Sequence, residues 1–302
     1  MSTRHFLSLL DLSSTELNNI IERARVVKDT FASKSQKRLM EGMTMVMLFE
    51  KASTRTRISF EVATAQFGGH TLFLDPGFSQ LSRGESLPDT ARVISSMANL
   101  IVMRTYAHDR ISLVAENSKV PVINAMSDSF HPCQLLADVL TFIEKRGQIR
   151  DAKVAWVGDG NNVCHSWIHA AHQFGFDLRL ACPTGYEPNA AILEVASKRV
   201  KLMNAPGTAV SGCDLVVTDT WLSIGSESEK EERLKAFSGF CVTNDLMQTA
   251  KPDALFMHCL PAYRGTEVSS EVLDGPQSVI WEEAENRLHA QKALIEFLIE
   301  SP

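Results

Sequence analysis

The sequence predicts an α/β protein built from two doubly wound parallel-sheet domains in tandem, linked by helices, with the C-terminal helix packing back on the first domain. Short apolar segments alternate with helical segments along most of the chain, and this alternation is typical of parallel sheets covered by helices on both faces. The alternation occurs in two series. A length of 302 residues also suits about two domains.

The first expected element is a helix that begins after Ser13. Ser13 and Glu16 have the spacing of a capping box, in which each side chain accepts a hydrogen bond from a backbone N–H at the helix start. Apolar side chains then recur on one helical face, at Leu17, Ile20, Ile21, Ala24, Val27 and Phe31. We therefore expect an amphipathic helix that packs on the core.

The first α/β series follows this helix. Its expected strands are the apolar runs at 43–49, 71–74, 100–103 and 120–123. Its expected helices lie near 57–67, 88–98 and 111–117. We assign residues 1–135 to this first domain, together with the last helix at 282–302.

The second series has expected strands at 153–157, 177–181, 200–203, 215–218 and 254–257. A helix over 132–145 links the two series, and the second domain is assigned to 148–281. The last helix has no strand after it, so it is expected to pack across the first domain. Ligands of open α/β sheets bind beyond the carboxyl ends of the strands, so functional residues are expected directly after each strand.

The composition limits the function. The chain has 30 Lys and Arg against 36 Asp and Glu, a net charge of −6, so it has no overall positive field for nucleic acid or an acidic lipid surface. No apolar run approaches the ~20 residues of a membrane span, and the first residues contain no signal-peptide core. The six cysteines form no C-x-x-C pair and no zinc-type spacing. We therefore expect free thiols, a cytoplasmic protein, and no metal or cofactor.

An anion site is indicated after the first strand. Ser53, Thr54, Arg55 and Thr56 lead directly into a helix, where hydroxyls, backbone N–H groups and a guanidinium gather at the positive end of the helix dipole. The alternative is an ordinary Ser N-cap followed by a solvated basic turn. The segment lacks the pattern of a Walker A loop.

Two further segments of the first domain end at the same rim. Arg104 follows the strand at 100–103, and His131 precedes Pro132, which suits the first position of a helix. His131 and Gln134 then face the start of that helix, where they would orient a small carbonyl and amide group. The alternative for His131 is a purely structural cap.

The second domain begins with a sequence similar to a dinucleotide fingerprint. Gly158 and Gly160 fit the motif, but Val163 stands in place of the third glycine. The next strand runs into Cys182 rather than ending in an acidic residue that would bind a ribose hydroxyl. Binding of NAD is therefore disfavoured, and the Asn162 amide becomes a candidate for a substrate carboxylate or amine.

Asp219 and Cys259 follow two later strands of the second domain. A carboxylate at this edge implies a cationic ligand group. The alternative for Cys259 is an inert buried thiol. Arg287 begins the last helix, where the alternative is a surface ion pair.

Four motifs occur in order over nearly the whole chain: Ser-Thr-Arg-Thr-Arg at 53–57, His-Pro-Cys-Gln at 131–134, Asp-Thr-Trp-Leu-Ser-Ile-Gly at 219–225 and His-Cys-Leu-Pro at 258–261. Together they resemble the motifs of the ornithine carbamoyltransferases. The related aspartate enzymes have His-Pro-Leu-Pro at the last motif and meet a dicarboxylate with basic residues, whereas this chain has Asp219. The resemblance therefore implies carbamoyl transfer to ornithine.

The resemblance implies ten residues that bind carbamoyl phosphate: Ser53, Thr54, Arg55, Thr56, Gln80, Arg104, His131, Gln134, Leu260 (through its backbone) and Arg287. Arg104 would bridge the phosphate and the carbonyl group. Gln80 would reach the carbamoyl phosphate of a neighbouring subunit, because the family forms homotrimers with shared sites.

The resemblance also implies residues that bind ornithine: Asn162, Asp219, Ser223, Ile224 (through its backbone) and Cys259. Ile224 departs from the Met that is usual in the family, and this bears on the shape of the ornithine loop. The residues implied in catalysis are Arg104, His131, Asp219 and Cys259. The neutral δ-amine of ornithine would attack the carbamoyl carbon to give citrulline and phosphate, as a step of arginine metabolism.

Three alternatives stay open on the sequence. A dehydrogenase is suggested by Gly158 and Gly160. Putrescine, acetylornithine or aspartate would be other acceptors, and a catalytically silent regulatory subunit would keep the same fold. The sequence does not distinguish arginine synthesis, the direction we expect, from citrulline breakdown, and it does not fix assembly beyond a trimer.

Overall fold

The computed structural model describes residues 3–32, 37–75, 77, 79–221 and 230–300. The chain forms two compact units, one from Met1–Leu140 with Glu285–Pro302 and one from Thr141–Ala284. Each unit contains one sheet, of four and five strands respectively, and every strand pair in both sheets is parallel. The predicted fold class is confirmed.

The sheet of the first unit has the strand order β2-β1-β3-β4. Its strands are β1 (Thr44–Phe49), β2 (His70–Leu74), β3 (Leu100–Arg104) and β4 (Val122–Met126). The expected strand at 120–123 is shifted, because the polar Asn124 belongs to β4. The buried Asn124 side chain is held by its Nδ2, which donates to the Leu7 carbonyl at 2.8 Å.

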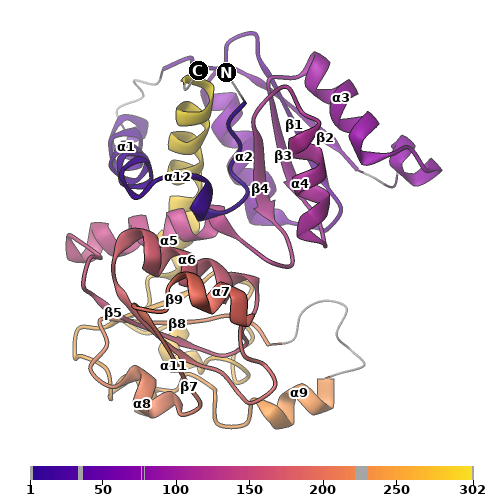
Figure 1. Ribbon diagram of the computed structural model, residues 1–302. Helices are drawn as coiled ribbons and strands as arrows, with labels where there is room; N and C mark the ends of the chain where they lie inside the picture. The colour runs from indigo at the N-terminus through magenta and orange to yellow at the C-terminus, as the bar shows by residue number, and fades with distance from the viewer. Residues whose placement is uncertain (1–2, 33–36, 76, 78, 222–229, 301–302) are drawn as a thin grey trace. The chain divides into compact units, whose positions relative to one another are not determined.

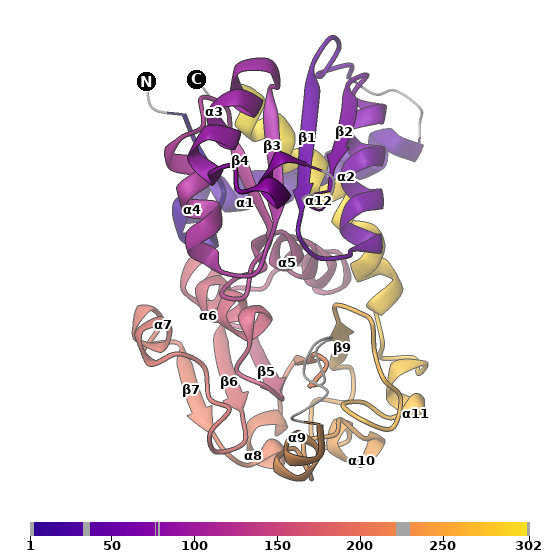
Figure 2. The same cartoon turned by 90° about the vertical axis from the view of Figure 1, so that its right-hand side faces the viewer.

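Helices cover both faces of this sheet, as Figure 1 shows. On one face of the sheet, Leu48, Ile101 and Met103 pack against the helices α3 (Leu87–Met97) and α4 (His108–Glu116). Alternate strand residues point to the other face, where α12 runs behind the sheet in Figure 2. The helices on that side are α1 (Ser14–Ala32), α2 (Thr54–Gln66) and the part of α12 (Ile280–Glu300) that belongs to the first unit.

The first helix and the last helix both agree with the sequence prediction. The Ser13 backbone N–H donates to the Glu16 carboxylate at 2.8 Å, and the Glu16 N–H donates to Ser13 Oγ at 3.3 Å, which closes the capping box of α1. The chain leaves the first unit within α5 (Pro132–Arg146) and re-enters it within α12, at Glu285. Short 3-10 turns lie at η1 (Leu9–Asp11) and η3 (Gln80–Arg83).

The sheet of the second unit has the order β7-β6-β5-β8-β9. Its strands are β5 (Lys153–Val157), β6 (Asp177–Ala181), β7 (Val200–Met203), β8 (Leu215–Thr218) and β9 (Leu255–His258). Its helices are α6 (Asn162–Phe174), α7 (Ala190–Val195), α8 (Pro206–Val210), α9 (Lys230–Ala236), α10 (Asn244–Met247) and α11 (Ser270–Leu273).

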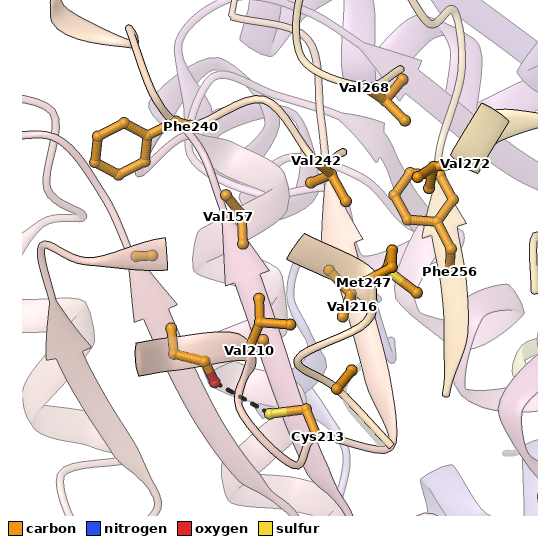
Figure 3. Close-up of a cluster of buried hydrophobic side chains, with 14 of the residues drawn as sticks. Val157, Val210, Cys213, Val216, Phe240, Val242, Met247, Phe256, Val268 and Val272 are labelled. Carbon is orange, nitrogen blue, oxygen red and sulfur yellow. Dashed lines mark hydrogen bonds between the residues drawn. The ribbon is translucent and has the colours of Figure 1, made fainter. Parts of the chain in front are cut away.

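One core of the second unit lies between its strands and the short helices α8 and α10. Val157, Val216 and Phe256 from the sheet pack in one cluster with Val210 of α8 and Met247 of α10 (Figure 3). Helices this short are marginal on their own. Their apolar contacts with the sheet therefore stabilise them.

In each sheet the order in which successive strands are added reverses once, between β1 and β3 and between β5 and β8. At such a switch point the two connections leave toward opposite faces, and a ligand site opens beyond the carboxyl ends of the strands. Functional side chains are therefore expected directly after β1, β3, β5 and β8.

Two global properties accompany this fold. Among the helices of the described residues, none combines the length and the apolar character that a membrane span requires. None of the six cysteines forms a disulfide within the described part of the chain, as the sequence predicted.

Lys292 is a buried charge in α12. Its side chain is only 1% exposed, its Nζ donates to Gln66 Oε1 at 3.0 Å, and the ammonium stands 4.8 Å from the centre of the Phe67 ring. Burial lowers the pKa of Lys292 to about 8. The folded state therefore binds fewer protons than the unfolded chain between pH 8 and the ordinary lysine pKa of ~10.4.

We expect the free energy of unfolding to rise with pH across this interval, because the unfolded state then holds the extra proton. The substitution Lys292→Met should stabilise the protein at pH 7 by about 1–3 kcal/mol and flatten this pH dependence. Denaturant unfolding at several pH values measures both effects. Lys119→Met, at an exposed lysine of the same unit, should leave the slope unchanged; an unchanged slope in Lys292→Met would contradict the prediction.

Candidate functional site

The loop after β1 presents hydroxyls and a guanidinium at the start of α2. Ser53 occupies the N-cap position with an extended backbone, but its side chain makes no capping hydrogen bond. Ser53 is thus an N-cap residue by position, as the alternative expected, but its hydroxyl does not cap the helix. Ser53 and Arg55 are half-buried, Thr54 is exposed and Thr56 is buried in the first turn.

Arg287 is a buried residue that links three helices of the first unit. It is 2% exposed, and its guanidinium donates to Gln134 Oε1 at 2.7 Å and to Thr56 Oγ1 at 3.1 Å. The Gln134 amide in turn donates to Asp138 Oδ1 at 2.8 Å. The alternative of a surface ion pair for Arg287 is therefore wrong, and three of the predicted residues form one network.

His131 lies directly before α5 and is buried among positive charges. Burial holds the pKa of His131 well below its ordinary value, and the charges of Arg287, Arg104 and Arg55 lower it further. The imidazole is therefore neutral at pH 7. Three guanidiniums around a neutral histidine suit an anionic ligand that carries a carbonyl group.

Arg104 ends β3 and pairs in register with Phe49 at the end of β1. Lys51, in the loop after β1, adds a cation that sequence reasoning gave no role. Its Nζ lies 4.0 Å from the centre of the Tyr106 ring, and its pKa is lowered first by burial and then by the charge of Arg104. The rim of the first unit thus carries a concentration of positive charge.

Gln80 stands apart from this group. It is exposed at the start of η3. Within the described part of the first unit, its side chain makes no hydrogen bond to the other residues predicted to hold carbamoyl phosphate.

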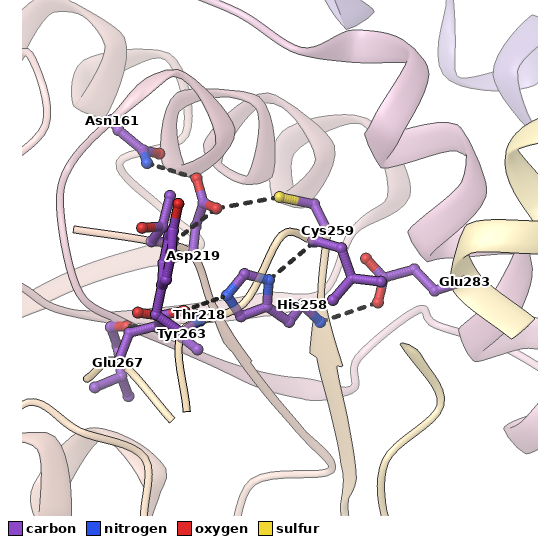
Figure 4. Close-up of polar contacts among 11 residues, drawn as sticks. Asn161, Thr218, Asp219, His258, Cys259, Tyr263, Glu267 and Glu283 are labelled. Carbon is purple, nitrogen blue, oxygen red and sulfur yellow. Dashed lines mark hydrogen bonds and ion pairs between the residues drawn. The ribbon is translucent and has the colours of Figure 1, made fainter. Parts of the chain in front are cut away.

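In the second unit, Asp219 follows β8 and Cys259 follows β9, and the two side chains are in contact (Figure 4). Asp219 is 8% exposed. Its carboxylate accepts hydrogen bonds from Cys259 Sγ at 3.2 Å, from Asn161 Nδ2 at 2.8 Å and from the Thr220 N–H at 2.8 Å. Cys259 is only partly buried, whereas the alternative of an inert thiol expected a buried one.

Asn161, which the sequence analysis did not select, holds Asp219 in place. Its Oδ1 accepts from the N–H groups of Val163 and Cys164 at 3.0 and 3.1 Å and so caps α6. The signal for this role was present, because Asn is a preferred residue directly before a helix. Asn162 is the first residue of α6 and is half-buried.

The two glycines of this loop are explained by packing. A Cβ atom on Gly160 would lie 2.2 Å from the Pro188 nitrogen, and one on Gly158, which has a φ of +141°, would lie 3.2 Å from Trp221 Nε1. Close approach of the chain itself therefore requires these glycines. The dinucleotide interpretation loses its main support.

Asp219, His258 and Cys259 offer ligand atoms within 4.8 Å of one another. However, Nδ1 of His258 accepts from the Leu260 N–H at 2.9 Å, and Nε2 lies 3.1 Å from Glu267 Oε1. Both ring nitrogens are thus engaged within the protein. This arrangement does not suit a metal ion.

Of the three remaining predicted residues, the structure describes one, Leu260. Leu260 directly follows Cys259 and has a positive φ of 58°. Ser223 and Ile224 lie outside the described residues.

Comparison with known proteins agrees with this geometry. Residues 4–144 match the carbamoyl-P binding domain of the aspartate/ornithine carbamoyltransferases, and residues 150–298 match their Asp/Orn binding domain. The chain is 54% identical over 296 residues to an ornithine carbamoyltransferase of Halorhodospira halophila (98% of this chain, 99% of that protein) and 56% identical over 299 residues to one of Methylococcus capsulatus (99% of each).

Solved structures give the same result. The ornithine carbamoyltransferase of Pyrococcus furiosus superposes with a TM-score of 0.95 at 46% identity, covering 100% of this chain and 98% of that one. An anabolic ornithine carbamoyltransferase of Campylobacter jejuni gives 0.91 at 42% identity, covering 98% and 99%. These similarities confirm the resemblance found in the motifs, and the chain belongs to the aspartate/ornithine carbamoyltransferase family.

Proposed function

We propose that the protein transfers the carbamoyl group of carbamoyl phosphate to the δ-amine of L-ornithine, giving L-citrulline and phosphate. The observation that carries this proposal is the Asp219 carboxylate in contact with the Cys259 thiol. A carboxylate at the acceptor site attracts an ammonium group and repels the second carboxylate of aspartate. The names of the relatives support the same acceptor.

Carbamoyl phosphate is proposed to bind at the rim of the first unit. Ser53, Thr54, Arg55 and Thr56 would hold the phosphate at the N-terminus of α2, where the helix dipole favours an anion. Arg104 would bridge phosphate and carbonyl, and Arg287 would hold the carbamoyl group with His131, Gln134 and the Leu260 backbone. The positive charge described above supports this assignment.

Ornithine is proposed to bind at the edge of the second unit, through Asn162, Asp219, Ser223, the backbone at Ile224, and Cys259. The attacking amine must be neutral. At pH 7.4 an amine with a lysine-like pKa of ~10.4 pays about 4 kcal/mol for losing its proton. We infer that Asp219 and Cys259 orient this amine and relay its proton.

The carbonyl oxygen gains negative charge as the amine attacks the carbamoyl carbon. The Arg104 guanidinium and the neutral His131 ring would donate hydrogen bonds to this oxygen. The tetrahedral intermediate would then release phosphate as the C–O bond breaks.

We further propose a cytoplasmic homotrimer with shared sites, acting in arginine biosynthesis, with no membrane or nucleic-acid partner. The similarity to the anabolic ornithine carbamoyltransferase of Campylobacter jejuni supports the biosynthetic direction. Exposed apolar side chains of the first unit, Ile58, Val93 and Met97, support contact with other subunits. The exposed position of Gln80 fits a role in a neighbouring site.

The reaction is tested by measuring citrulline, or the matching carbamoyl product, with ornithine, acetylornithine, putrescine and aspartate as acceptors. We expect ornithine to give a kcat/KM at least about 100-fold above the others, because the unmatched acceptors leave buried polar groups without partners. An equal or higher kcat/KM with another acceptor would contradict the proposal and identify that acceptor as the substrate. No product with any of the four would favour a silent subunit.

Two substitutions separate the proposed half-sites. Arg55→Ala should raise the KM for carbamoyl phosphate by about 10- to 100-fold, because charge-assisted hydrogen bonds to the phosphate are lost. Cys259→Ala should chiefly raise the KM for ornithine and lower kcat. Steady-state kinetics with each substrate varied in turn measures both effects.

Matched controls exist for each substitution. Arg57→Ala removes an exposed arginine that pairs with Glu61 at 2.9 Å, and Cys241→Ala removes another partly buried thiol. Both controls should keep their kinetics. Normal kinetics in Arg55→Ala and Cys259→Ala would count against the assigned roles.

Asn161→Ser separates helix capping from the orientation of Asp219. Serine also caps helices well, but it cannot replace the amide donor to Asp219. We expect the KM for ornithine to rise about five- to tenfold with little change in Tm. Asn189→Ser is the matched control, because Asn189 caps α7 through the Ala191 N–H at 2.9 Å without contacting Asp219. A kinetic change of equal size in both variants would argue against orientation.

A further inference from the structure

Two hydrogen bonds fix the backbone on either side of Cys259. The His258 N–H donates to Glu283 Oε2 at 3.0 Å, and the Leu260 N–H donates to His258 Nδ1 at 2.9 Å. The Cys259 side chain donates to Asp219. The direction of the thiol is therefore set by the turn that residues 258–260 form (Figure 4).

This turn contains an unfavourable backbone conformation. Leu260 has a φ of 58°, in the left-handed region that residues with a Cβ atom rarely occupy. Such conformations persist where surrounding contacts hold them, and they concentrate at functional sites. One contact that holds Leu260 is the hydrogen bond that its own N–H donates to the His258 ring.

That bond requires one particular tautomer of His258. Nδ1 can accept a hydrogen bond only when it carries no proton, so the proton of a neutral ring must lie on Nε2. His258 and Glu267 are both fully buried, with 0% of each exposed, and Nε2 lies 3.1 Å from Glu267 Oε1. A carboxylate oxygen at this distance accepts the Nε2 proton in a hydrogen bond and selects the required tautomer.

Glu267 is held in turn by the same loop. Its Oε1 also accepts from the Tyr263 N–H at 2.6 Å. The chain after the turn thus places the Glu267 carboxylate next to the His258 ring. A chain of hydrogen bonds runs from Glu267 through His258 to the Leu260 N–H, beside the thiol that faces Asp219.

We propose that His258 and Glu267 are positioning residues: Glu267 fixes the tautomer of His258, and His258 holds the Cys259–Leu260 turn that presents the thiol to the acceptor amine. This inference rests on the proposed function. Neither side chain is exposed, so both act through Cys259 and Leu260 rather than on the substrate.

The test measures kcat/KM for ornithine and Tm in four variants. His258→Leu removes the acceptor of the Leu260 N–H, and Glu267→Leu removes the group that keeps the proton off that acceptor. Each should lower kcat/KM about tenfold or more. Glu267→Gln keeps an oxygen acceptor for Nε2 and should stay within about threefold of wild type. His258→Asn should retain more activity than His258→Leu, because an Asn carbonyl can accept from the N–H two residues later.

A double variant separates positioning from simple loss of stability. In the His258→Asn background there is no ring tautomer to select, so adding Glu267→Leu should cause no further fall in kcat/KM. It should still lower Tm, because the Tyr263 N–H loses its acceptor. A further tenfold fall in that background would overturn the proposal.

If the Leu variants do not fold, His258→Asn and His258→Gln form a second pair. The Gln carbonyl lies one methylene farther out and should not close the turn, so we expect about a tenfold lower kcat/KM than in His258→Asn. Equal values in the two would overturn the proposal.

The control lies at the opposite end of β9. Gln277 Nε2 donates to the Ala254 carbonyl at 2.8 Å, so Gln277→Leu removes a comparable side-chain bond away from Cys259. It should lower Tm without changing kcat/KM. If wild type forms no citrulline, the proposed function fails; if wild type is active and a folded Glu267→Leu matches it, the positioning proposal fails.

Discussion

The register of the parallel strands is the constraint on which both half-sites depend. Thr218 of β8 pairs with His258 of β9, so the next residues, Asp219 and Cys259, leave the sheet side by side and meet at 3.2 Å. In the first unit, Phe49 pairs with Arg104, which brings the loop after β1 next to that guanidinium. A slip of one residue would turn every side chain to the opposite face and would separate each pair.

Neutral groups donate to or accept from one charged side chain in each proposed half-site. Arg287 donates to the neutral Thr56 and Gln134. Asp219 accepts from neutral donors throughout the described residues. Neutral partners orient a charged group and offset part of its desolvation without cancelling the charge. Elsewhere in the second unit, Asp159 instead forms an ion pair with Arg233, an arrangement that suits structure more than ligand binding.

The sequence predicted most of the elements, because buried parallel strands appear as apolar runs and helices as periodic ones. It misplaced the bounds of β4, because Asn124 lies inside the strand, where its Nδ2 donates to the Leu7 carbonyl. Arg104, Asp219 and Cys259 could be selected as candidate site residues because each follows a predicted strand. Spacing could not indicate Glu267, because its contact with His258 depends on the three-dimensional path of residues 261–267. Arg287 lies inside α12 rather than at its start, where the sequence analysis placed it. Its burial depends on tertiary packing, which helical periodicity alone does not contain.

The choice of asparagine at position 161 follows from its two neighbours. The cap of α6 needs a side-chain oxygen acceptor, and Asp219 needs a donor at the same place. Serine, threonine and aspartate supply the oxygen, but aspartate would add a second negative charge next to Asp219, and the hydroxyls are too short to reach both groups. The amide of asparagine carries both an acceptor and a donor on one rigid plane. One side chain therefore joins the start of a helix, needed for folding, to the orientation of a carboxylate, needed for binding.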